Sequence, residues 1–245
     1  MNIKKFIPNS IKQEGKYLLY RLLKIPYNRS EVPVVITAFL PADKPINVMD
    51  VGASKGNFMK SVANYYQINK AVLVEPLTDL KAILNEKFPD KSRFVVESVA
   101  VSDKSGSVDF YYSKDADVLS SILKIKDEYH NDQYLTKPTL ITVETETLDT
   151  IANRNNLNVI DLLKIDVQGV EHLVLMSGLN TLKRTKLVYT EISYKPMYEG
   201  SSTFFDLFKI LTECNFRLVN TSKGWVNPDG EIIQGDALFV NNALL

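Results

Sequence analysis

The chain has 245 residues, of which 45% are hydrophobic and 24% are charged, a composition that excludes disordered, collagenous and coiled-coil proteins. Its 29 Lys and Arg residues equal its 29 Asp and Glu residues, and this zero net charge argues against general nucleic-acid binding, which needs a cationic surface. With one cysteine, Cys214, and two histidines, an internal disulfide, a cysteine-cluster metal site and a histidine-rich zinc site are excluded. We therefore expect a soluble, reduced, cytoplasmic protein without a bound metal.

The first 44 residues differ in pattern from the rest of the chain. The run from Tyr17 to Lys24 is amphipathic, but it is too short and too charged to cross a bilayer, and no transmembrane segment is expected. We predict an N-terminal helical extension over residues 1–44, which we place on the protein's own core rather than on a membrane or a partner. A single domain follows over residues 45–245. A homodimer formed through the N-terminal helix is an alternative that the sequence does not decide.

From residue 46 onward, short apolar runs alternate with longer amphipathic segments, the pattern of βαβ units. Strands are expected at residues 46–51, 71–75, 93–97, 107–112, 139–145, 161–166 and 187–191, with a late antiparallel pair at 216–219 and 237–240. Helices are expected from residue 56 and over residues 77–88 and 204–211. The polar stretch 113–138 is interpreted as a functional loop. The sequence predicts an α/β fold with a doubly wound, mostly parallel sheet of seven core strands.

The turn after the first predicted strand has features of a ligand-binding loop. It runs Asp50-Val51-Gly52-Ala53-Ser54-Lys55-Gly56-Asn57-Phe58. Gly52 permits a sharp turn, and Gly56 is expected to let a ligand or a strand approach the next helix. Ser54 stands where the dinucleotide fingerprint Gly-x-Gly-x-x-Gly has the glycine that admits a pyrophosphate. The loop therefore suits a ligand without a pyrophosphate.

A carboxylate follows the second predicted strand. Glu75 lies 25 residues after Asp50 and directly before Pro76, where a carboxylate can accept hydrogen bonds from the two hydroxyls of a ribose. The alternative roles are an ordinary exposed strand end for Glu75 and a loop cap for Asp50. A glycine loop without pyrophosphate glycines, together with a ribose carboxylate, suggests S-adenosylmethionine as the cofactor.

Three stretches of the chain resemble one family, the FkbM-type class I methyltransferases. These stretches are the Asp50–Phe58 loop, Val74-Glu75-Pro76, and Leu162-Leu163-Lys164-Ile165-Asp166-Val167-Gln168-Gly169-Val170-Glu171. Thr147-Leu148-Asp149 and Val188–Ile192 also fit, so that the resemblance extends over residues 47–240. It implies a seven-stranded, Rossmann-like methyltransferase fold and methyl transfer from S-adenosylmethionine, usually to a hydroxyl oxygen. Members of the family often act on sugars of glycans, glycolipids or natural products.

The expected cofactor site draws on three strand ends, and the residues after the third strand should flank the adenine. The expected lining residues are Asp50, Gly52, Ala53, Ser54, Asn57, Glu75, Pro76, Ser98 and Val99. One residue departs from the family pattern: Gln168 stands where the family usually has glutamate. A glutamine donates and accepts hydrogen bonds but cannot take a proton, so a role of that glutamate as a base or a ligand is absent from this chain.

A second group of charged residues is expected near the methyl group. Asp166 closes the fourth core strand, and Lys164 lies two residues earlier on the same side of it. Asp166 is a candidate for the base that takes the proton of an acceptor hydroxyl, and His172 competes because a pKa of about 6.5 suits that task. Glu191 is expected in the same cleft, and Lys164 is expected to pair with a carboxylate. A divalent metal between Asp166 and Glu191 is an alternative that we do not favour.

We predict an S-adenosylmethionine-dependent O-methyltransferase that acts on a hydroxyl of a sugar, a glycan or a glycosylated small molecule. The segment Tyr194–Tyr198 is the best candidate for a substrate wall, because aromatic rings can stack on sugars. Other aromatic candidates are Tyr111, Tyr112, Tyr129, Tyr134 and Trp225. The alternatives are a nicotinamide-dependent oxidoreductase on a similar sheet, and a non-catalytic scaffold that keeps a relic cofactor site.

Overall fold

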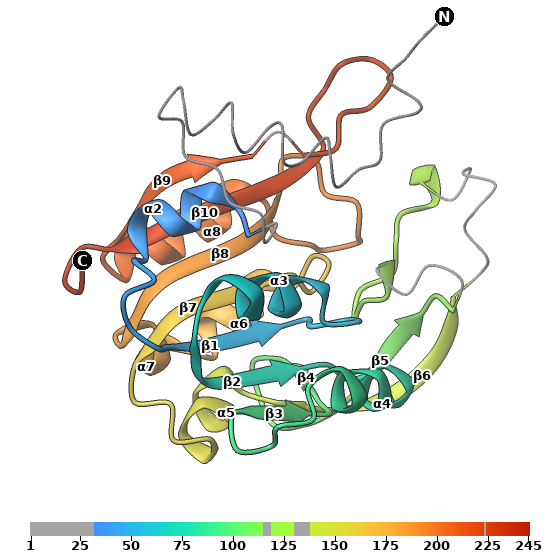
Figure 1. Cartoon of the computed structure of the whole chain (residues 1–245). Coiled ribbons are helices and arrows are strands. Elements are labelled where there is room, and N and C mark those ends of the chain that lie inside the picture. Colours follow the sequence, from blue (N-terminus) through green and yellow to red (C-terminus); the bar gives the residue numbers. More distant parts are fainter. Residues whose placement is uncertain (1–31, 115–118, 130–137, 223) are drawn as a thin grey trace, which may run out of the picture.

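The computed structural model describes residues 32–114, 119–129, 138–222 and 224–245. Its centre is a seven-stranded sheet (Figure 1). In spatial order the strands are β3 (Phe94–Glu97), β2 (Ile68–Val74), β1 (Ile46–Val51), β7 (Ile160–Ile165), β8 (Thr185–Ser193), β10 (Gln234–Asn241) and β9 (Phe216–Thr221). The predicted α/β fold with seven core strands is confirmed.

Strand order reverses in the middle of the sheet. β1 pairs in parallel with β2 on one side and with β7 on the other, and β8 continues the parallel arrangement beyond β7. β10 runs antiparallel to both β8 and β9, as predicted for the late pair. Because ligands of open α/β sheets bind at the carboxyl ends of the strands near such a reversal, the ends of β1, β2 and β7 are the expected place for a site.

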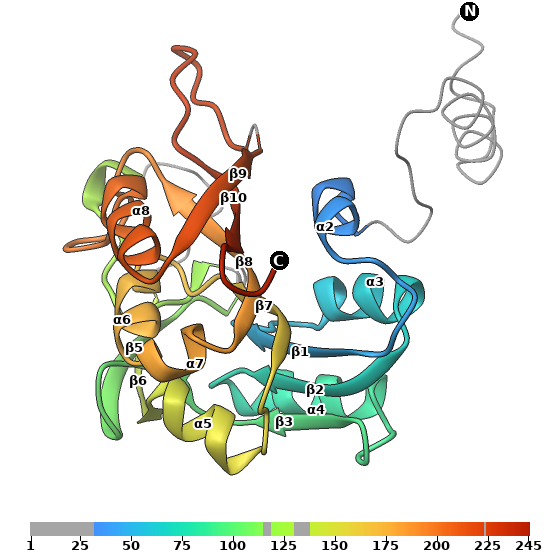
Figure 2. The same ribbon diagram turned by 90° about the vertical axis from the view of Figure 1, so that its left-hand side faces the viewer.

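Helices cover both faces of the sheet (Figure 2). One face carries α2 (Val34–Phe39), α3 (Asn57–Tyr65) and α4 (Thr78–Lys87). The other face carries α5 (Leu148–Arg154), α6 (Glu171–Met176), α7 (Leu179–Leu182) and α8 (Phe204–Glu213). A short 3₁₀ helix, η3 (Asp127–Tyr129), lies outside these layers. α8 begins with a capping box between Thr203 and Asp206, which satisfies backbone N–H groups of its first turn.

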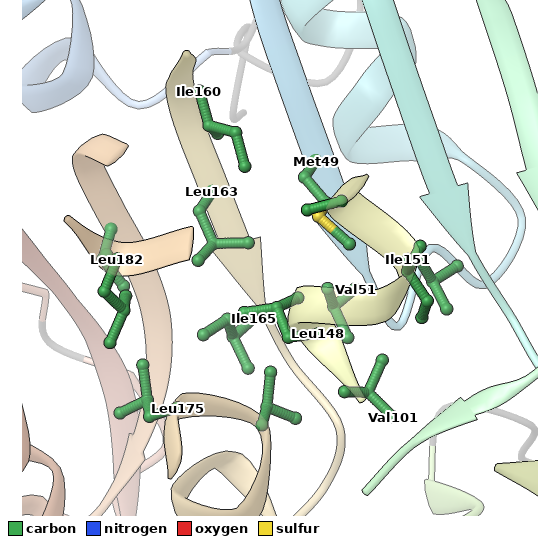
Figure 3. Close-up of a cluster of buried hydrophobic side chains, with 14 of the residues drawn as sticks. Met49, Val51, Val101, Leu148, Ile151, Ile160, Leu163, Ile165, Leu175 and Leu182 are labelled. Carbon is green, nitrogen blue, oxygen red and sulfur yellow. The ribbon is translucent and has the colours of Figure 1, made fainter. Parts of the chain in front are cut away.

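The central strands are buried on both faces, because the helices enclose them. Every residue of β7 is buried, which explains its nearly continuous apolar sequence. On the α5–α8 face, Met49 and Val51 of β1 pack with Leu163 and Ile165 of β7 against Leu148 of α5 (Figure 3). Each such side chain contributes about 1.5–3 kcal/mol by leaving water, so this core fixes the strand ends that carry the site.

A smaller sheet lies beside α4. It consists of β4 (Ala100–Val101), β6 (Thr139–Glu146) and β5 (Gly106–Tyr112) in that spatial order. The strands predicted at residues 107–112 and 139–145 therefore exist, but they do not join the parallel sheet; they pair antiparallel with each other. Phe110 and Val143 pack on Leu77 and Leu80 at the start of α4, which places this sheet next to the end of β2.

The predicted N-terminal helical extension lies mostly outside the described residues, and so does the Tyr17–Lys24 run. Of the first 44 residues the structure describes 32–44, in which Val32, Ile36 and Leu40 are buried in the core on the α2–α4 face. In the described ranges no helix is long and apolar enough to cross a membrane. Residues 115–118 and 130–137 of the predicted loop, including His130 and Tyr134, also lie outside the described residues.

Candidate active site

Two adjoining cavities open at the carboxyl ends of the central strands. The first, the β2-side cavity, is lined by Glu75 together with mainly apolar residues from β1, β2, β4, β5 and the β7–α6 loop. The second, the β8-side cavity, is lined by residues from α3 and from the ends of β7, β8 and β10. Gly52, Ser54 and Asp166 line both cavities, so the two form one continuous site.

The turn after β1 makes the floor that the cavities share. Gly52 has a φ of +77°, and a Cβ atom there would lie 1.8 Å from the backbone oxygen of Asp166. Only glycine satisfies both conditions. Gly56 has a φ of +70°, and a Cβ there would lie 2.7 Å from side-chain atoms of Leu84 and Phe88. The close neighbour of Gly56 is therefore helix α4, and not a ligand or a strand as the sequence suggested.

Glu75 is the polar anchor of the β2-side cavity. Its side chain is buried, and its two oxygens accept hydrogen bonds from the backbone N–H groups of Ser54 (2.9 Å) and Leu77 (3.0 Å). Burial raises the pKa of Glu75, and these backbone donors oppose that rise. Each oxygen keeps a second acceptor position. The structure therefore fixes the β1 loop to the end of β2 and leaves Glu75 able to bind the hydroxyls of a ligand.

Asp50 lies beneath the loop and lines neither cavity. It is fully buried, and its Oδ1 lies 3.2 Å from Nζ of Lys164 on the neighbouring strand β7. Nζ of Lys164 also donates to the backbone oxygen of Gly52 (2.7 Å) and lies 3.6 Å from Oδ2 of Asp166. Burial alone would lower the pKa of Lys164, but the attraction of Asp50 and Asp166 outweighs it and raises that pKa. Lys164 is thus a structural cation, paired with carboxylates as the sequence suggested.

Carboxylates dominate the β8-side cavity. Asp166 follows β7, Glu191 lies on β8 and Asp236 on β10, and all three line the cavity. Burial raises the pKa of Glu191 well above its ordinary value, and repulsion from Asp166, Glu171 and Asp236 acts in the same direction. The rings of Phe58 and Tyr189, which also line the cavity, stack with centroids 5.8 Å apart. The cavity therefore offers hydrogen-bond acceptors beside an aromatic surface, a combination that suits a polyhydroxylated ligand.

Gln168 links the two carboxylates that face each other in this site. Its Nε2 donates to Oδ1 of Asp166 (2.8 Å) and to Oε2 of Glu191 (3.0 Å), and its Oε1 accepts from the hydroxyl of Tyr198 (2.9 Å). The sequence singled out Gln168 only as a departure from the family pattern, and Tyr198 only as part of a substrate wall. Tyr198 is instead buried.

Glu171 and His172 have other surroundings. The carboxylate of Glu171 is buried and accepts from the backbone N–H groups of Val167 (3.2 Å) and Gly169 (3.1 Å), so it shapes the β7–α6 loop. Burial raises its pKa to about 7. His172 lies on α6 and lines neither cavity, and burial lowers its pKa although Asp206 opposes this. A role for His172 as the base remains a prediction that this placement does not favour.

The other predicted cofactor residues divide between the cavities. Pro76 and Val99 line the β2-side cavity, whereas Ala53 and Asn57 line the β8-side cavity. Ser98 lines a separate surface hollow with Tyr112. The sequence did not predict the contribution of the small sheet and its loop to the β2-side cavity; these residues are Phe110, Ser120 and Ile122. They are distant in the chain from the cofactor motifs, so no local signal marks them.

Neither the predicted substrate wall nor the other aromatic candidates appear in the described lining of the β8-side cavity. Tyr194 is 37% exposed and packs against Phe204 of α8. Tyr129 and Trp225 contact each other. Among the residues that the structure describes, no group of three or more His, Cys, Asp or Glu side chains is arranged to hold a metal ion.

A reversed parallel sheet, a glycine turn after β1 and a buried carboxylate after β2 define an open α/β fold with a nucleoside-type site at its switch point. A model of the methyltransferase FkbM domain matches residues 50–218, and the chain belongs to this family. The nicotinamide-dependent oxidoreductase alternative is thereby set aside.

Three known proteins are similar to the chain, the first in sequence and the other two in fold. The chain is 28% identical over 228 residues to the 2-O-methyltransferase NoeI of Sinorhizobium fredii, and the alignment covers 91% of this chain and 90% of NoeI. The crystal structure of methyltransferase FkbM from Methylobacillus flagellatus matches with a TM-score of 0.52 and 11% identity over 80% of this chain and 43% of that chain. Aeropyrum pernix fibrillarin, crystallised with natively bound S-adenosyl-L-methionine, matches with a TM-score of 0.48 and 9% identity over 86% of this chain and 75% of that chain.

Proposed function

We propose that this protein transfers a methyl group from S-adenosylmethionine to a hydroxyl oxygen of a carbohydrate or a glycosylated small molecule. The observation that carries the proposal is the pair of adjoining cavities that share Gly52, Ser54 and Asp166. One cavity has the apolar walls and the buried carboxylate that a nucleoside needs, and the other has the polar lining that a hydroxylated acceptor needs. A group-transfer reaction requires this juxtaposition of two ligands.

The residues of the β2-side cavity fit S-adenosylmethionine. Glu75 lines this cavity, and in the described part of the chain no ion pair engages its carboxylate. Its free acceptor positions suit the two ribose hydroxyls. Leu77, Val99 and Phe110 offer apolar surface for the adenine. The acidic side chains of Asp166 and Glu191 suit a sulfonium, because opposite charges attract strongly in a partly buried site.

The chemistry needs little from the protein beyond alignment and one proton acceptor. When bound, S-adenosylmethionine supplies a methyl group that its sulfonium has already activated. Gly52 and Ser54 shape the floor beneath both ligands, and Asp166, which lines both cavities, accepts the proton of the acceptor hydroxyl. Glu191 is the second carboxylate of the same site. Such general base catalysis contributes typically 10²–10⁴-fold.

The acceptor class rests on the lining of the β8-side cavity and on the relative. Asp166, Glu191 and Asp236 offer acceptors to sugar hydroxyls, and the stacked pair of Phe58 and Tyr189 offers an apolar ring surface. NoeI, 28% identical over 228 residues, is a 2-O-methyltransferase. We therefore propose a neutral, hydroxyl-rich acceptor.

Calorimetric titration with S-adenosylmethionine, S-adenosylhomocysteine and NADH tests the donor. We expect micromolar binding of the first two and none of NADH. Binding of NADH alone would contradict the proposal. No binding of any of the three compounds to the folded protein would favour the scaffold alternative. The acceptor is then sought with a labelled methyl donor and pairs of sugars that differ by one hydroxyl. Methylation of one member of a pair identifies the oxygen that is modified.

A further inference from the structure

Gln168 lies in a backbone conformation that its residue type rarely adopts. Its φ is +58°, in the left-handed region, which costs a residue with a Cβ roughly 1–2 kcal/mol. The loop around it is fixed by several contacts. The backbone oxygen of Gln168 accepts from Oγ of Ser121 (2.7 Å), and the next residue, Gly169, donates to Glu171 (3.1 Å). Strain that is held in place at a ligand site points to a functional role for the residue that bears it.

The orientation of the Gln168 amide follows from its neighbours. An ionised carboxylate only accepts hydrogen bonds, so the nitrogen and not the oxygen must face Asp166 and Glu191. The amide nitrogen has two N–H groups, and each one serves one carboxylate, at 2.8 Å and 3.0 Å. The hydroxyl of Tyr198, at 2.9 Å, donates to the amide oxygen on the opposite side. A buried tyrosine thus holds the amide in the orientation that serves both acids.

Charge around Glu191 makes this amide important. Asp166 after β7, Glu171 on α6 and Asp236 on β10 all repel its charge. Lys164 is paired with Asp50 and Asp166, and in the described part of the chain no ion pair joins Glu191 to a lysine or an arginine. Apart from Gln168, the described side-chain donor to Glu191 is the amide of Gln234, at the longer distance of 3.4 Å.

We propose that Gln168 is a positioning residue for methyl transfer, which holds the carboxylates of Asp166 and Glu191 side by side, with a hydrogen bond to each, where the two cavities meet. This role rests on the proposed function, because it assumes that the acceptor's hydroxyl proton moves to one of these carboxylates. A glutamate at position 168 would place a third acid between them and supply no N–H group. In this chain the amide therefore stands in the place of a third acid and donates to both carboxylates.

The test is the titration of the Glu191 carboxyl group, followed by ¹³C NMR in protein without donor or acceptor. Gln168→Met removes the N–H groups with little change in length, and Gln168→Glu removes the amide donor and adds a charge. We expect the apparent pKa of Glu191 to rise by roughly one unit in the first variant and by more in the second. Tyr198→Phe, which frees the amide to turn, should raise this pKa by less. Gln234→Met is the matched control, with a small effect on the pKa of Glu191, because its amide lies at the longer distance of 3.4 Å.

Activity supplies a second readout once an acceptor is known. The acidic limb of the pH dependence of kcat should move to higher pH in the same order of variants, whereas a purely structural residue would lower kcat equally at every pH. Unchanged titration of Glu191 in folded Gln168→Met and Gln168→Glu proteins would overturn the proposal. The titration is measured without S-adenosylmethionine. If the protein did not bind S-adenosylmethionine, the proposed function would be refuted, and the titration would still report on the role of Gln168.

Discussion

The β2-side and β8-side cavities share a floor, yet they are built in different ways. The β2-side cavity is lined mainly by apolar side chains around one carboxylate, Glu75, and its defining turn and strand end lie close together in the sequence. The β8-side cavity gathers charged side chains from the loop before α3 and from β7, β8 and β10. The comparison indicates that a local motif specifies the polar anchor of the β2-side cavity, whereas long-range packing brings together the charged residues of the β8-side cavity.

The two cavities also balance their buried charges differently. Glu75 is held by backbone N–H groups of Ser54 and Leu77, an arrangement that needs no counter-ion. The acids of the β8-side cavity depend on the side chains of Lys164 and Gln168. Substitutions at the shared floor, on the β8 side and on the β2 side should therefore have separable effects.

The largest effect is expected at the shared floor. In Gly52→Ala the new Cβ would meet the backbone oxygen of Asp166 at 1.8 Å, at a φ of +77°, and we expect a loss of more than about 4 kcal/mol in the free energy of unfolding. Gly200→Ala is the control, because its φ is +75° but nothing lies within 4 Å of the added atom, so it should lose about 1 kcal/mol. Urea denaturation measures both, and equal losses would show that the loop yields.

A smaller effect, confined to the β8 side, is expected from Lys164→Met. It leaves the fully buried Asp50 without its cation and should cost about 3–5 kcal/mol. Burial already raises the pKa of Asp50. When the pKa of a carboxyl group is higher in the folded than in the unfolded protein, the folded protein is stabilised as the pH falls and the group takes up a proton. The deficit should therefore shrink as the pH falls from 8 toward 5 in urea denaturation.

Lys186→Met is the control for this prediction. Lys186 forms an ion pair with Asp161 at 2.7 Å, but its side chain is 32% exposed, and the buried Asp161 also accepts a hydrogen bond from the backbone N–H of Asn47. Loss of Lys186 should therefore cost less than loss of Lys164. If the two lysine variants proved equally stable, the buried ion pair of Lys164 and Asp50 would not stabilise the turn after β1.

The smallest effect, confined to the β2 side, is expected from Glu75→Gln. Loss of charge-assisted hydrogen bonds to the ribose costs about 1.5–3 kcal/mol, which corresponds to roughly 10- to 100-fold weaker S-adenosylmethionine binding by calorimetry. Glu97→Gln is the matched control: Glu97 ends the neighbouring strand β3 but bonds Arg154 and Asn155 and does not line the cavity. Equal affinity of the Glu75→Gln and wild-type proteins would remove Glu75 from the site.

The sequence predicts those features that depend on neighbours in the chain. The bounds of β1 are predicted correctly because a short, mainly apolar run ends at Gly52. Asp166 follows the strand beside β1, as predicted, because the apolar residues of β7 mark it as a buried strand. β5 and β6 were found as strands, but their separate sheet was not, since apolar alternation does not identify the partner of a strand.

The bridging role of Gln168 could not be predicted for a similar reason. Its amide connects Asp166 on the preceding strand end, Glu191 on β8 and Tyr198 in the segment after β8. These residues meet only through the tertiary fold. The sequence signal was limited to an unexpected residue type at one position, without the geometry that explains it.

The position of β10 has a consequence for the order in which the site forms during synthesis. β10 is the last strand of the chain and lies between β8 and β9. The last lining residue of the β2-side cavity is Val170, whereas the β8-side cavity also needs Asp236. At elongation rates of about 5–20 residues per second, a nascent chain therefore contains the complete lining of the β2-side cavity several seconds before that of the β8-side cavity.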